Sequence, residues 1–156
     1  MKRRINQIIG IAAGVSILLA TTIQADGAKV TVDDRNPFTE PILIRATCYT
    51  SDQGAITSSG QSVRTGTIAG KKEWEGCVAL LYTYKIVDGA AVPDEMIGIY
   101  EVIDTGAGID TDGDGKGDTI PSGQSIDVFQ TDNSQVRQWI NTYGDYVMMM
   151  LVKGKG

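Results

Sequence analysis

Histidine is absent from the 156 residues of this chain. Its absence excludes a Ser-His-Asp triad, a Cys-His nucleophile, a histidine general base and a histidine-ligated zinc site. If the chain is an enzyme, carboxyl groups must therefore carry its proton transfers.

Basic residues are also few. The chain has 14 Lys and Arg residues against 19 Asp and Glu residues, which gives a net charge of −5. This balance argues against nucleic acid as a partner, because neutralising phosphates requires clustered Lys and Arg. It does not select a substrate.

The first 25 residues have the layout of a secretory signal. Basic residues at positions 2–4 precede an apolar run over 8–20, and Ala25 provides a small residue for cleavage. An uncleaved membrane anchor through residues 5–24 is the alternative, although the apolar run is short for a spanning helix. In both cases we expect the folded part to be secreted or extracytoplasmic. Loss of residues 1–25 would change the net charge to −8.

Cysteine occurs only twice, at Cys48 and Cys77. In an oxidising compartment one such pair can close as a disulfide, and otherwise the two residues are buried thiols. For a secreted chain we expect the disulfide.

The remaining pattern predicts one domain. Residues 26–40 are polar and are expected to form a tether before a domain over 41–156. β-rich segments predict strands over 42–49, 67–69, 77–87, 96–103, 125–129 and 146–152, with a short strand near Val63. A helix is expected from Asp132 or Asn133 to Tyr143, with Gly144 as its stop. Six strands, one short helix and no βαβ rhythm predict an all-β fold, a small closed barrel.

Two aspartates stand in apolar surroundings on either side of a glycine-rich loop. Asp104 follows Val102 and Ile103, and Asp127 lies between Ile126 and Val128. Burying a carboxylate among such residues costs free energy unless a partner or a function requires it. Asp104 and Asp127 are therefore candidate catalytic residues, and structural capping of turns is the alternative.

The loop between these aspartates is acidic at alternating positions. Counted from Asp110, acidic residues at positions 1, 3, 5 and 9 with glycine at 6 match the first half of a calcium loop. The candidate metal residues are Asp110, Asp112, Asp114, Lys116 and Asp118. Pro121 takes the twelfth position, where an EF-hand has glutamate. Calcium binding and a merely solvated acidic turn both remain open.

Several short segments occur in a characteristic order. They read ATCYT at 46–50, ITSSG at 56–60, GTIA at 66–69, IDTG at 103–106 and IDVF at 126–129. This succession resembles the 3D domain, a family named for three aspartates. The family occurs in bacterial cell-wall enzymes such as the membrane-bound lytic transglycosylase A type and the firmicute stationary-phase survival proteins. Over residues 42–152 the resemblance implies a double-psi β-barrel and cleavage of peptidoglycan glycan strands.

The resemblance also implies site residues. The DTG aspartate of the family matches Asp104, and its acid/base aspartate matches Asp127. The segment that holds the family's first aspartate reads Ala-Gly-Lys-Lys at 69–72, so this aspartate is missing, and Glu73 or Glu75 is the candidate replacement. A groove lined by Tyr49, Thr57 and Trp74 would contact the glycan, although a lone tryptophan is more often part of a core.

A lytic transglycosylase needs only one carboxyl group that acts first as an acid and then as a base, and we expect Asp127 in this role. No cofactor is required, calcium at residues 110–118 is optional, and a monomer is expected. A non-catalytic glycan-binding barrel is the alternative. A dimeric aspartic protease built on Asp104-Thr105-Gly106-Ala107 is a weaker one.

Overall fold

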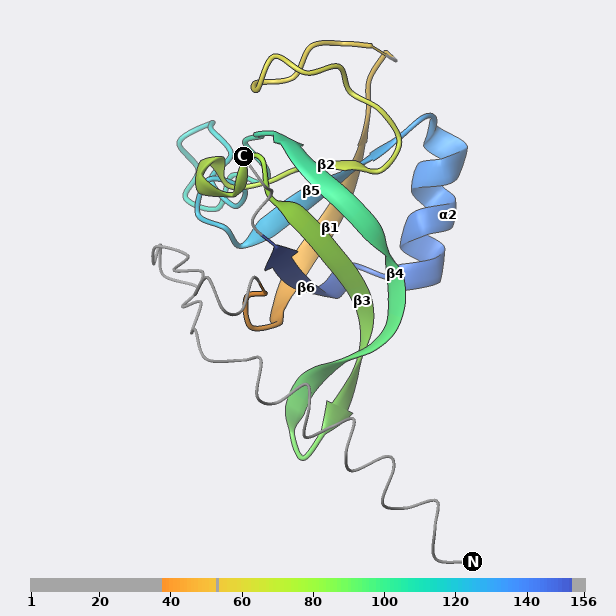
Figure 1. Ribbon diagram of the computed structural model, residues 1–156. Coiled ribbons are helices and arrows are strands. Elements are labelled where there is room, and N and C mark those ends of the chain that lie inside the picture. Colours follow the sequence, from red (N-terminus) through yellow and green to blue (C-terminus); the bar gives the residue numbers. More distant parts are fainter. Residues whose placement is uncertain (1–37, 53, 153–156) are drawn as a thin grey trace, which may run out of the picture.

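Six strands close into a barrel in the computed structural model, which describes residues 38–52 and 54–152. The elements in chain order are β1 (Ile42–Thr50), β2 (Thr67–Ala69), the 3₁₀ helix η1 (Lys72–Trp74), β3 (Val78–Val87), β4 (Ala90–Asp104), β5 (Ser125–Gln130), α2 (Asn133–Tyr143) and β6 (Tyr146–Val152). Around the barrel the strands follow the order β1-β5-β2-β4-β3-β6 (Figure 1). The predicted all-β class with one short helix is confirmed. The expected signal and the tether up to residue 37 lie outside the described residues.

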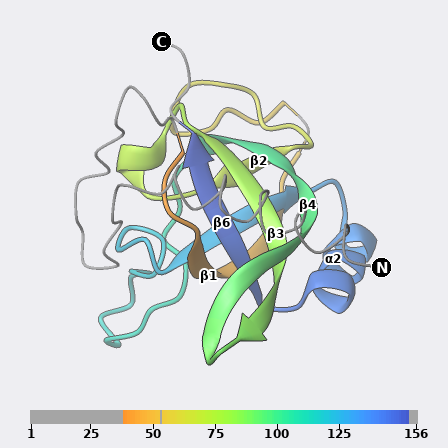
Figure 2. The ribbon, with the colours of Figure 1, turned by 60° about the horizontal axis from the view of Figure 1, so that its bottom comes forward.

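The first and last strands of the barrel are neighbours. β6 pairs antiparallel with β1 on one side and with β3 on the other, as Figure 2 shows. β1 and β5 run parallel, and so do β2 and β4. Alternate residues of neighbouring strands fill the interior, where Ile68, Val102, Ile126 and Val128 are fully buried. Burial of these side chains is the main term that stabilises the barrel.

The hairpin of β3 and β4 projects from the barrel, at the bottom of Figure 1. Asp88 and Gly89 both have positive φ, of 52° and 80°, as a two-residue hairpin turn requires. The ladder continues to Val87 opposite Ala90, so β4 begins at residue 90 instead of the predicted 96. Near Val63, the predicted short strand is reduced to an isolated bridge between Ile56 and Ser62.

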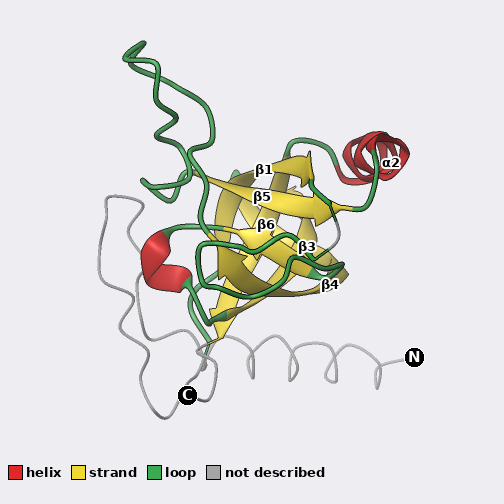
Figure 3. Ribbon diagram, turned by 90° about the horizontal axis from the view of Figure 1, so that it is seen from above, coloured by secondary structure: helices red, strands yellow, loops and turns green. Residues whose placement is uncertain are grey.

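Helix α2 packs outside the barrel against β1 and β5 (Figure 3). The Asp132 side chain accepts hydrogen bonds from the backbone N–H groups of Ser134 and Gln135, which caps the first turn. Gly144 ends the helix with φ of 76°. The predicted limits of this helix are confirmed. Within the described residues, no helix is long and apolar enough to cross a membrane.

The predicted disulfide is wrong for this structure, in which Cys48 and Cys77 are not joined to each other. Cys48 lies on β1, whose neighbours are β5 and β6, whereas Cys77 precedes β3, whose neighbours are β4 and β6. The two residues therefore come from strands that are not adjacent. Burial and the nearby Asp127 carboxylate raise the pKa of the Cys48 thiol to about 12, so it stays protonated.

Candidate active site

The barrel brings Asp104 and Asp127 to either side of one small residue, Ala69. β2 lies between β4 and β5, and Ala69 is paired with Asp104 on β4 and with Asp127 on β5. Two strand spacings separate the Cα atoms of the two aspartates, or about 10 Å. Since directly paired residues point to the same face, both carboxyl groups flank the Ala69 methyl group.

A β-bulge makes this arrangement possible. The ladder pairs Ile68 with Val102 but then pairs Ala69 with Asp104, so Ile103 is an extra residue in β4. Without the bulge, strict alternation would put Ile103 beside Ala69 and turn Asp104 toward the barrel interior. We refer to the region around Ala69, Asp104 and Asp127 as the aspartate groove.

Asp127 is half-buried in this groove and has few hydrogen-bond partners. Thr47 lies opposite it in the parallel pair of β1 and β5, and the Thr47 hydroxyl donates to Asp127 Oδ1 over 2.8 Å. Among the described residues, no hydrogen bond reaches the other carboxyl oxygen. Burial raises the pKa of Asp127, and the Thr47 hydrogen bond opposes this shift. Desolvation, rather than the charge of Asp104, is thus the cause, and it favours a carboxyl group that can hold a proton for transfer.

Asp104 is held much more firmly. Its Oδ1 atom accepts from the backbone N–H groups of Ser58, at 3.0 Å, and Thr105, at 2.9 Å. The Ser58 hydroxyl in turn accepts from the Thr105 N–H at 2.9 Å. These bonds tie the loop before β2, at the top of Figure 1, to the end of β4. The contacts of Asp104 agree with the structural alternative, in which its carboxylate caps backbone N–H groups.

Tyr49 lies near both carboxyl groups. Its hydroxyl donates a long hydrogen bond of 3.5 Å to Asp104 Oδ2, and its ring packs edge-to-face against Phe129 with centroids 5.5 Å apart. Burial, followed by the charges of Asp104 and Asp127, raises the Tyr49 pKa above its usual range. The hydroxyl therefore remains a hydrogen-bond donor in the groove at every physiological pH.

The other predicted site residues lie around the groove rather than in it. Trp74 is only 4% exposed and belongs to the core, because its ring packs against Gly70 and Gly123. Its burial favours the core role over contact with a sugar. Thr57 is buried and bonds within its own loop. The Glu73 carboxylate is exposed and lies 3.9 Å from the Lys71 ammonium group, so it lacks the burial that affects Asp127.

The acidic loop gathers three of its aspartates. Carboxylate oxygens of Asp110, Asp112 and Asp118 all lie within 4.8 Å of one another. Asp114 is not part of this group, and its carboxylate accepts a hydrogen bond from the Lys116 backbone N–H. Backbone N–H groups of the loop glycines donate to Asp110 and hold the pKa of its carboxyl group below the usual range. Three converging carboxylates are the hard oxygen ligands that calcium prefers.

Sequence reasoning missed the roles of Thr47 and Ser58. Both belong to the short segments at 46–50 and 56–60, but neither carries a charge that would single it out. The parallel pairing of β1 with β5 places Thr47 opposite Asp127, so Thr47 could have been identified only if this pairing had been expected. No local pattern indicates that the Ser58 N–H meets Asp104, 46 residues later.

Comparisons with known proteins leave the family open. No family model matches the chain, and no curated protein matches it. The chain is similar to a solved structure of the E. coli enzyme MltA in an apo form, with a TM-score of 0.41 and 14% identity. That protein is a lytic transglycosylase. The match covers 69% of this chain but only 30% of the enzyme, so the proposal that follows rests on the residues described above.

Proposed function

We propose that this chain acts outside the cytoplasm on the glycan strands of peptidoglycan, as a lytic transglycosylase with Asp127 as its single acid and base. The observation that carries the proposal is the state of Asp127. Burial raises its pKa, Thr47 donates a hydrogen bond to one of its oxygens, and the other oxygen has no hydrogen-bond partner among the described residues. The resemblance of the segments around Asp104 and Asp127 to the 3D domain supplies the substrate class. We propose the double-psi type of barrel on the basis of the same resemblance.

In this mechanism the protonated Asp127 carboxyl group first gives its proton to the glycosidic oxygen, and the bond from this oxygen to the anomeric carbon breaks. The resulting carboxylate then takes the proton of the muramic acid 6-hydroxyl as that oxygen bonds to the anomeric carbon. The product is a 1,6-anhydro sugar, no water is consumed, and Asp127 recovers its proton. A second carboxyl group is therefore not obligatory, which accommodates the missing aspartate of the family pattern.

Digestion of purified peptidoglycan by the full chain, followed by mass spectrometry, tests this function. We expect products that end in 1,6-anhydromuramic acid, and we expect Asp127→Asn to abolish them while thermal unfolding shows an intact fold. Reducing-end products would instead indicate hydrolysis, with a second base to be found. An Asp127→Asn protein with full activity would refute the assignment of Asp127.

A non-catalytic glycan-binding barrel remains the second candidate. The observation in its favour is that Glu73 is exposed and lies 3.9 Å from the Lys71 ammonium group, which argues against Glu73 as the replacement for the missing aspartate. Sedimentation of the protein with intact, uncleaved glycan would support this alternative.

The aspartic protease alternative requires a dimer in which each copy supplies one aspartate. The barrel of one chain already brings two aspartates beside Ala69, so a second copy is not needed to form a pair. Pepstatin-sensitive peptide cleavage would reverse that judgement.

Calcium at the acidic loop is part of the proposed function. Asp110, Asp112 and Asp118 offer the converging oxygens, and the loop joins the end of β4 to the start of β5. A bound ion would offset the repulsion among the three carboxylates and would order the connection between the two groove aspartates.

A further inference from the structure

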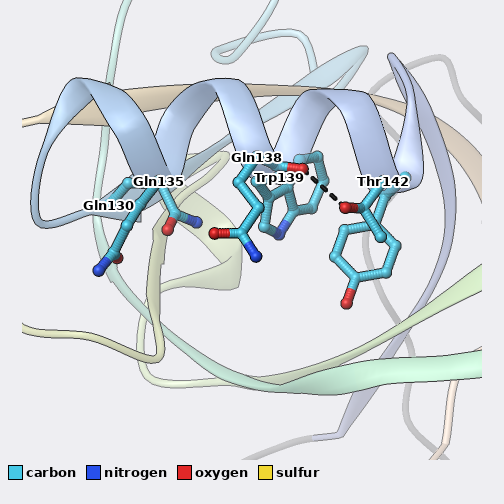
Figure 4. A pocket seen from close by; sticks show the side chains of 6 residues that line it. Gln130, Gln135, Gln138, Trp139 and Thr142 are labelled. Carbon is cyan, nitrogen blue, oxygen red and sulfur yellow. Dashed lines mark hydrogen bonds between the residues drawn. The ribbon is translucent and has the colours of Figure 1, made fainter.

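A pocket lies beside helix α2, away from the aspartate groove. Its lining residues are Gln130, Gln135, Gln138, Trp139, Thr142 and Tyr143 (Figure 4). Its volume of about 280 Å³ is near the lower end of the range for small-molecule sites. We call it the α2 pocket.

The α2 pocket is separate from the groove, although β5 contributes to both. Gln130 follows Asp127 by three residues, which corresponds to about 10 Å along a strand. Because successive side chains of a strand alternate, Gln130 and Asp127 point to opposite faces. A ligand in the pocket would therefore not touch Asp127.

Three glutamine side chains give the pocket its hydrogen-bonding capacity. Gln135 and Gln138 are three residues apart on α2 and share one helix face, to which Gln130 is added from β5. In Figure 4 the three side chains lie on the same side of the helix. No other described residue bonds their carboxamide groups. Each carboxamide therefore keeps two donors and one acceptor for a ligand.

Trp139 adds a largely buried aromatic ring to the lining. Its side chain is only 6% exposed, and its indole N–H has no hydrogen-bond partner. The N–H group approaches the Tyr100 hydroxyl, where it opposes the raising effect of burial on the Tyr100 pKa, but it does not reach hydrogen-bond geometry. The ring packs edge-to-face against Tyr143 at 5.2 Å. Because the Trp139 side chain lines the pocket, a ligand there would change the surroundings of this N–H group.

The lining of the α2 pocket favours an uncharged ligand. All six side chains are neutral, so an ionic ligand would lose hydration without gaining a counter-charge. Carboxamides beside aromatic rings suit a neutral molecule that has hydroxyl groups, an amide group and an apolar face. We propose that the α2 pocket is a second carbohydrate site, which binds one N-acetylated sugar unit independently of Asp127. The identity of the polymer that supplies this sugar rests on the proposed function.

Two separate sites for one polymer would change how the protein works on it. A glycan held in the α2 pocket stays near the groove after one bond has been cut, so its effective concentration there is high. The pocket would thus retain the protein on long strands while having little effect on short fragments.

Titration of the ¹⁵N-labelled full chain with chitotetraose, an oligomer of N-acetylglucosamine, tests this site. The chain has two tryptophans, so the spectrum has an internal reference, because Trp74 is packed elsewhere in the core. We expect the indole N–H signal of Trp139 to shift and that of Trp74 to stay. Gln138→Ala should weaken binding about three- to tenfold, as loss of a neutral hydrogen bond does. Asn141→Ala is the matched control, since this exposed carboxamide lies on α2 outside the pocket.

An unmoved Trp139 signal at saturating chitotetraose would overturn the proposal, as would equal weakening by Gln138→Ala and Asn141→Ala. The outcome is independent of catalysis. If Trp139 responds but peptidoglycan is not cleaved, the α2 pocket stands and the proposed function fails. If 1,6-anhydro products form but Trp139 does not respond, the proposed function stands and the pocket proposal fails.

Discussion

Replacing Thr47 with valine removes the hydroxyl that donates to Asp127 but keeps nearly the same side-chain shape. The hydrogen bond lowers the pKa of Asp127, whereas burial raises it. In Thr47→Val only the effect of burial remains, so the carboxyl group keeps its proton to a higher pH. Because the first step of the proposed mechanism requires the protonated acid, we expect the alkaline limb of the pH profile of kcat/KM to move to higher pH.

The size of this movement follows from the bond that is lost. A hydrogen bond to a charged group contributes about 1.5–3 kcal/mol, and the lower end applies because Asp127 is only half-buried. Since about 1.4 kcal/mol corresponds to one pH unit, the limb should move by about one unit. Orientation of Oδ1 by Thr47 is lost as well, so the maximum rate should fall severalfold.

The assay is the initial rate of release of 1,6-anhydromuramic products across the pH range. Thr50→Val is the control, because Thr50 lies at the exposed end of the same strand and away from Asp127. Its profile should match that of the unaltered chain. If the limb of a folded Thr47→Val protein stays in place or moves downward, Asp127 is not the acid.

Three further predictions follow from the same contacts. Since the folded-state pKa of Asp127 is raised above 3.8, its contribution to stability is present below that pH and is lost as the pH rises through the folded pKa. The melting temperature of Asp127→Asn should therefore rise relative to that of the unaltered chain as the pH increases. Calcium should raise the melting temperature, and Asp110→Asn should reduce this effect far more than Asp114→Asn, whose carboxylate is outside the cluster. Gly117→Ala would place its Cβ 2.4 Å from the Gly108 carbonyl oxygen, so it should destabilise the fold by about 1–3 kcal/mol in urea unfolding.

The strands and the helix could be predicted because their signals are local. The Asp132 cap, the Gly144 stop and the Asp88–Gly89 turn each require a particular residue at a particular backbone conformation. Strand β4 was predicted too short because Ala90 and its neighbours are weak strand formers that the hairpin ladder nevertheless includes.

The candidate site was harder to predict because its contacts are long-range. The two aspartates are visible in the sequence, but the bulge at Ile103 that turns Asp104 toward Ala69 is not. The burial of Trp74 depends on Gly70 and Gly123, which come from different loops. The order of strands around the barrel, rather than any local pattern, keeps the two cysteines on strands that are not adjacent.

The position of β6 between β1 and β3 has a consequence for how the chain acquires its structure. Ile42 on β1 pairs with Met149 on β6, so closure joins segments that are made at the start and at the end of domain synthesis. A nascent chain that lacks residues 146–152 has two unpaired strand edges and no closed core. Folding must therefore be largely post-translational, and contacts of such sequence separation make it slow.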